Sequence, residues 1–160
     1  MTESKITIWN RNFICVLLAN FGLCMGHYTV NPLVAAYAQF LGAGAGVMGL
    51  LSGMFFGVAL AMRPVSGPMI TKIDKRRLTV MVFALGALAC LGYAAFQSVG
   101  MFVLFRFING VQYSFVGSLL MTVAGDSLPP AKMASGLGVF GVGGAVGMSL
   151  APAISMWILE

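Results

Sequence analysis

The sequence predicts an all-α polytopic membrane protein, and three observations lead to this fold class. Hydrophobic residues make up 59% of the 160 residues and charged residues only 8%, whereas soluble domains are about 45–50% apolar and about 25% charged. The apolar residues form long stretches, and most of the charges lie between these stretches. So few charged side chains cannot cover a soluble domain, and so apolar a chain is not disordered.

Five apolar stretches are long enough to cross a bilayer, whose hydrocarbon core of about 30 Å needs about 20 helical residues. The expected spans cover residues 12–36, 47–66, 78–98, 101–124 and 133–158. The first stretch is much longer than the apolar core of a signal peptide, so we interpret it as a span. Residues 1–11 are the expected N-terminal segment, and 12–160 the expected transmembrane bundle.

The expected loops alternate in charge. Residues 41–47 and 98–100 carry no charge, whereas 71–77 and 126–132 carry Lys or Arg, as does the segment before the first span. All loop cations therefore fall on one side, which the positive-inside rule assigns to the cytoplasm together with the N-terminus. This pattern predicts a multi-pass protein of the plasma membrane, with the lipid bilayer as its partner.

Several classes of function are disfavoured. The net charge of +5 sets topology rather than forming the basic soluble face that nucleic acid needs. Three cysteines, none in a C-x-x-C pair, and a single histidine predict no metal site. No catalytic Ser-His-Asp arrangement or phosphate-binding loop is found, so we expect neither an enzyme nor a cofactor.

Polar side chains inside a span are costly and mark candidate functional positions. In the first expected span, Asn20, Cys24, His27 and Asn31 are spaced by 4, 3 and 4 residues and form one stripe. The stripe is either one wall of a substrate cavity or a set of interhelical hydrogen bonds. His27 is either a proton relay or a neutral hydrogen-bonded imidazole.

In the fourth expected span, Arg106, Asn109, Gly110, Tyr113 and Gly117 share one helix face. This face suits a cavity or a packed seam, unless Arg106 snorkels outward. We interpret Arg106 as binding anionic groups or tuning a nearby acid. The spans carry no acid at mid-depth, so a carboxylate for proton coupling has to come from elsewhere.

The fifth expected span is dense in glycine. Gly143, Gly147 and Ala151 are spaced by four, which lets another helix approach closely. With Gly138 and Pro152, this pattern indicates either dimerising packing or a helix that bends or slides during a cycle.

These features together resemble the major facilitator superfamily, in particular its drug:proton antiporter-like efflux members. Residues 63–77 resemble the family's loop between spans two and three, G-x-x-x-D-R-x-G-R-R, with matches at Gly67, Lys72, Lys75 and Arg76. Arg106 and Gly110 match the R-x-x-x-G of span four. The antiporter pattern G-x8-G-x3-G-P of span five is matched at Gly138, Gly147, Ala151 and Pro152, with alanine in place of the last glycine.

The resemblance implies two six-helix halves that rock around a central cavity, driven by a proton gradient. It also implies a cytoplasmic charge network that controls switching, with Arg63 at the end of span two and Asp126 at the base of span four. Two departures weaken the loop match, since Thr71 replaces its acid and Asp74 its glycine.

The expected function is secondary transport, with proton-coupled efflux of small, lipophilic molecules. Only five of the family's twelve spans are expected here, so we predict an N-terminal portion that needs its C-terminal half or a second copy. The alternative is a non-transporting interaction protein, or an inactive remnant, that assembles through the glycine-rich fifth span.

Overall fold

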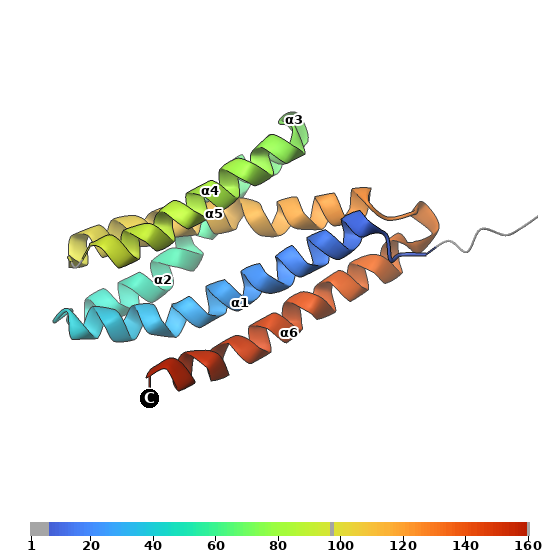
Figure 1. Cartoon of the computed structure of the whole chain (residues 1–160). Coiled ribbons are helices and arrows are strands. Elements are labelled where there is room, and N and C mark those ends of the chain that lie inside the picture. The colour runs from blue at the N-terminus through green and yellow to red at the C-terminus, as the bar shows by residue number, and fades with distance from the viewer. Residues whose placement is uncertain (1–6, 97, 160) are drawn as a thin grey trace, which may run out of the picture. The chain divides into compact units, whose positions relative to one another are not determined.

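The computed structural model describes residues 7–96 and 98–159, and these are helical with no strand. Residues 1–6 of the expected N-terminal segment, position 97 of the expected span 78–98 and residue 160 of the expected bundle lie outside the described residues. The helices are α1 (Arg11–Phe40), α2 (Ala45–Ala61), α3 (Arg63–Lys72), α4 (Lys75–Ala95), α5 (Val99–Asp126) and α6 (Met133–Leu159), with a short 3-10 helix at Pro130–Lys132 (Figure 1). The all-α membrane fold class is confirmed.

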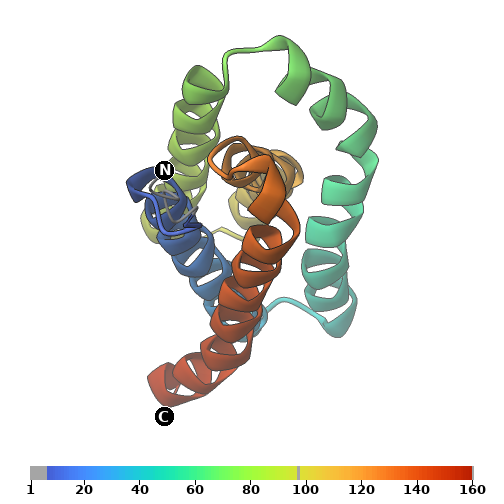
Figure 2. The same ribbon diagram turned by 90° about the vertical axis from the view of Figure 1, so that its right-hand side faces the viewer.

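The long helices α1, α4, α5 and α6 are each apolar and long enough to cross a membrane. α2 and α3 satisfy the same test only together and are bent by 48° where they meet, so the described residues hold four or five candidate spans. In Figure 2 the chain passes from α2 through α3 and returns along α4.

The second expected span, 47–66, does not coincide with one straight helix. α2 ends at Ala61, and α3 begins at Arg63 with Pro64 in its first turn. Proline is tolerated there because the first-turn N–H groups have no partner within the helix. The stretch 63–77, which resembles a loop, is therefore helical over thirteen of its residues, ten in α3 and three at the start of α4.

The helices belong to two compact units, residues 1–30 with 120–160 and residues 31–119. In the first unit α6 lies along the first part of α1 (Figure 1). A Cβ added at Gly147 would lie 3.0 Å from the Phe21 carbonyl oxygen and 3.2 Å from the Cys24 Cβ. A Cβ at Gly143 would lie 2.7 Å from the Leu17 Cδ1. These glycines are what allow the two helices to approach.

Side chains then join the two helices. The Asn20 amide donates to the Phe140 carbonyl at 3.2 Å, and the Ser155 hydroxyl donates to the Thr29 carbonyl at 2.7 Å. Asn10 caps α1 by accepting from the Phe13 N–H at 2.8 Å. Polar groups inside this unit are thus satisfied locally, as an apolar environment requires.

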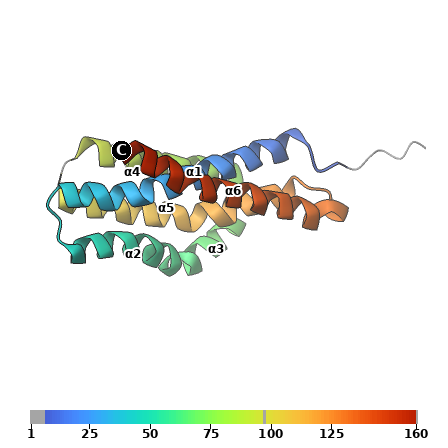
Figure 3. The same ribbon diagram turned by 90° about the horizontal axis from the view of Figure 1, so that it is seen from below.

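In the second unit the first part of α5 packs between α2 and α4. Figure 3 shows α2 running alongside α5. A Cβ added at Gly110 would meet the Phe55 carbonyl oxygen at 3.0 Å, so this glycine permits contact with α2. On the other side, the Phe105 ring presses against Gly92 of α4. The resulting core includes Leu51, Phe55, Val82, Ala89 and Val116.

Candidate functional site

Arg106 is the central residue of the candidate site in the second unit. It lies in α5, and its side chain is only 1% exposed. Its Nε donates to the Leu51 carbonyl of α2 at 3.0 Å, and its Nη2 donates to the Asn31 side-chain oxygen. The guanidinium therefore points into the unit and does not snorkel outward.

Aromatic rings surround this guanidinium. Its Cζ lies 4.5 Å from the centre of the Phe55 ring, which is cation–π geometry. The Tyr113 ring lies 4.9 Å from the same Phe55 ring. The Tyr93 hydroxyl of α4 is buried near Arg106, and no hydrogen-bond partner for it is found among the described residues.

The charge of Arg106 has no acidic partner among the described residues. The acids there are Asp74, at the start of α4, and Asp126, at the end of α5 in the other unit. A guanidinium carries five N–H donors, and its hydrogen bonds to Asn31 and Leu51 are to uncharged acceptors. The arrangement can attract an anion or stabilise the charged form of an approaching carboxylic acid.

The structure brings together four of the expected cavity residues. Asn31 bonds Arg106 directly, Asn109 is 7% exposed on the same helix, and the Tyr113 ring packs at a tilt against the Phe55 ring beneath Arg106. Asn20 and His27 lie in the first unit. Asn20 is used in packing against α6, and the His27 Nδ1 lies 3.0 Å from the Leu23 carbonyl of its own helix.

Sequence reasoning did not single out several residues of this site. Phe55 and Tyr93 are aromatic residues in apolar stretches, where nothing local distinguishes them from lipid-facing ones. Gln112, which packs against Gly86 of α4, is also a polar residue inside a span and is only 2% exposed. The cost of burying an amide could have identified it.

The expected switch residues lie around α3 and the start of α4. Arg63, Gly67 and Lys72 are exposed on α3, and Lys75 and Arg76 lie in the first turn of α4. Asp74 caps α4, its carboxylate accepting from the Arg77 N–H at 2.9 Å. Because Asp126 belongs to the other unit, its contact with this basic segment stays a prediction.

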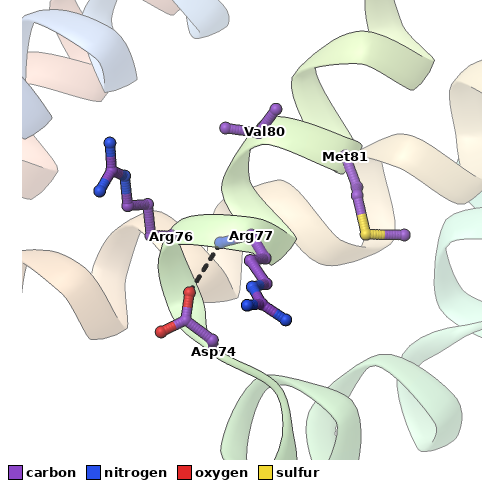
Figure 4. A pocket seen from close by; sticks show the side chains of 5 residues that line it. All are labelled: Asp74, Arg76, Arg77, Val80 and Met81. Carbon is purple, nitrogen blue, oxygen red and sulfur yellow. Dashed lines mark hydrogen bonds between the residues drawn. The ribbon is translucent and has the colours of Figure 1, made fainter.

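A pocket of about 690 Å³ surrounds the first turns of α4. Its lining includes Asp74, Arg76, Arg77, Val80 and Met81 (Figure 4). In the figure the side chains of Arg76 and Arg77 leave the first turn on different sides, and Met81 lies one turn beyond Arg77. The pocket thus combines cationic and apolar lining.

The motif residues of the glycine-rich helix α6 differ in which neighbours they contact. Gly143 and Gly147 face α1, whereas nothing lies within 4 Å of a Cβ added at Gly138. Ala151 is fully buried, and its carbonyl accepts from Ser155 at 3.1 Å. Pro152 lies inside α6 without ending it. Across the described ranges, no three His, Cys, Asp or Glu gather as a metal site.

The fold and the site define a class, a polytopic helical membrane protein with a fixed cation buried inside its spans. The sequence model of the Major Facilitator Superfamily matches residues 16–160, and the chain belongs to this family. It is therefore a membrane protein of a transporter family, whose members are not enzymes. The searches of curated proteins and of solved structures gave no match.

Proposed function

We propose that the chain forms part of a proton-driven exporter of small, lipophilic molecules in the plasma membrane. One observation carries the proposal, the buried guanidinium of Arg106 held by Asn31 and the Leu51 carbonyl and covered by Phe55. Aromatic rings suit lipophilic cargo, and the fixed charge suits proton coupling. The resemblance of α6 to the antiporter pattern supports the direction of transport.

The coupling chemistry follows from the fixed charge. An opposite charge within about 4–6 Å lowers the pKa of a carboxyl group by about 1–3 units. An acid that approaches Arg106 during rocking therefore releases its proton, and an acid that moves away binds one. We propose that this acid comes from the cargo or from a second set of helices, supplied by the other half or by a second copy. No cofactor is needed.

The alternative, a non-transporting interaction protein, depends on the α6 glycines. Gly143 and Gly147 are already in contact with α1 of the same chain. They are therefore not available to a partner unless α1 and α6 separate. Because the α6 glycines are used within the chain, transport is favoured over a role in assembly. We propose that the switch residues on α3 and α4 control this transport.

The test is export of a lipophilic dye from vesicles that carry the chain together with its completing helices. We expect Arg106→Gln to reduce export driven by a pH gradient at least about tenfold, and Arg106→Lys to retain part of it. Phe107→Leu, on the exposed face of α5, is the matched control. A His27→Gln variant tests whether that imidazole relays the proton.

Two outcomes would contradict the proposal. One is export that continues unchanged when an ionophore collapses the pH gradient. The other is an Arg106→Gln variant that exports at the unmodified rate while Phe107→Leu does the same. Either result would show that the buried charge has no part in coupling.

A further inference from the structure

The pocket around the start of α4 lies apart from the Arg106 site. The first turn of α4 presents three cations, Lys75, Arg76 and Arg77, beside the single carboxylate of Asp74. That carboxylate is engaged by the Arg77 backbone N–H. In the described part of the chain, neither Arg76 nor Arg77 uses its guanidinium in a hydrogen bond or ion pair. Two exposed guanidinium groups are thus available to an anion.

Large apolar side chains lie directly beside these arginines. Residues four apart on a helix are neighbours, so Arg76 lies next to Val80 and Arg77 next to Met81. Val80 is 65% exposed and Met81 is 63% exposed. A pocket with cations at one end and exposed methyl and thioether groups at the other matches an amphiphile better than a free anion.

The apolar lining continues along α4 on the Arg77 side. At about 100° per residue, Met81, Leu88 and Leu91 follow Arg77 on one face of the helix, and Leu88 and Leu91 are 52% and 67% exposed. Ten residues separate Met81 from Leu91, a rise of about 15 Å. This equals about half of the 30 Å hydrocarbon core, the depth of one leaflet.

We propose that this pocket binds an anionic phospholipid. Its phosphate lies beside the guanidinium group of Arg77, and an acyl chain lies along Met81, Leu88 and Leu91 on the same face. Guanidinium forks match phosphate oxygens in a bidentate way. Basic pockets at the cytoplasmic ends of spans hold anionic headgroups for this reason. This proposal does not rest on the proposed transport function, although the pocket shares Arg76 with the proposed switch residues.

The test is the affinity of the purified full chain for phosphatidylglycerol, measured in detergent with a fluorescent lipid analogue. Each cation near an anionic lipid contributes about fivefold in affinity, so R76Q/R77Q should raise the Kd about thirtyfold. R76K/R77K keeps the charge and loses the bidentate geometry, and a smaller rise is expected. The control R11Q/K132Q removes two cations at other helix ends and should change the Kd less than about twofold.

The acyl-chain arm uses Leu88→Asn, which should weaken phosphatidylglycerol binding several-fold. Glycerol phosphate should fail to compete at the concentrations at which phosphatidylglycerol binds. Competition by glycerol phosphate would overturn the lipid assignment and leave a free-phosphate site. Equal losses in R76Q/R77Q and R11Q/K132Q, or equal binding of phosphatidylcholine, would show diffuse attraction and overturn the site itself. R76K/R77K keeps the test decisive if the neutral variant fails to fold.

Discussion

The hydrogen bond between Asn31 and Arg106 can be tested by a double-mutant cycle. Asn31→Leu replaces the acceptor with an apolar side chain of similar size and leaves the buried guanidinium with one hydrogen bond, to Leu51. A hydrogen bond to a charged group contributes about 1.5–3 kcal/mol. Neutral pairs between membrane helices average only about 0.6 kcal/mol, because the unfolded chain also finds partners. We therefore expect a loss of about 2 kcal/mol.

Arg106→Met has the complementary effect. It leaves the Asn31 oxygen unpaired and removes the cation–π contact with Phe55, but it also removes a buried charge, so the expected loss is about 1–2 kcal/mol. In the double variant nothing polar is left unpaired at this contact. Replacing both partners of a buried pair with apolar residues is often close to neutral. The coupling energy, the difference between the double variant and the sum of the two single losses, should therefore be about 3–4 kcal/mol.

The assay is reversible unfolding of the chain in mixed micelles with sodium dodecyl sulfate, followed by circular dichroism. Phe107→Leu, one residue along α5 on the exposed face, should change the unfolding free energy by less than about 0.5 kcal/mol. Additivity of the two single variants within about 0.5 kcal/mol would refute the reasoning. It would mean that the asparagine and the guanidinium are not bonded to each other.

Two further predictions concern helix packing and capping. Gly147→Val places a Cβ about 3 Å from the Phe21 carbonyl, a backbone atom that cannot yield, so the contact of α1 with α6 should open. Proteolytic susceptibility measures this opening, and Gly138→Val is the control because its site is open. Asp74→Ala removes the cap of α4 and should cost about 1 kcal/mol of stability, whereas Asp74→Asn should cost less; equal effects of the two changes would exclude a capping role.

The positions of the long helices and the burial of Arg106 could be anticipated from local pattern alone. An apolar stretch of about 20 residues is enough to predict a membrane-spanning helix. A charged side chain within such a stretch is stable where it faces the interior of the bundle or water, so its burial is expected. The pairing of Asn31 with Arg106 could not be anticipated in this way. It joins residues 75 apart in the chain and depends on how α1 and α5 align.

The region around Pro64 shows a different limit. Its apolar stretch runs past the proline, so hydropathy extends the expected span to residue 66, whereas α2 ends at Ala61. The polar composition of 63–72 is typical of a loop, yet ten residues form α3. Proline restricts the preceding backbone and so favours a break, but it fits a new first turn equally well. Local composition does not distinguish these two outcomes.

The energetics of Arg106 argue that its charge is kept for use rather than for stability. A central arginine costs about 2.5–3.5 kcal/mol on insertion scales. Its contacts with Asn31, Leu51 and Phe55 offset much of this cost, but an apolar side chain would avoid it. Neutral acceptors also leave the positive charge uncompensated in an apolar environment. A negative group that comes within a few ångströms is therefore stabilised more here than in water. In the proposed function, movement of such a group toward and away from Arg106 is what couples charge to transport.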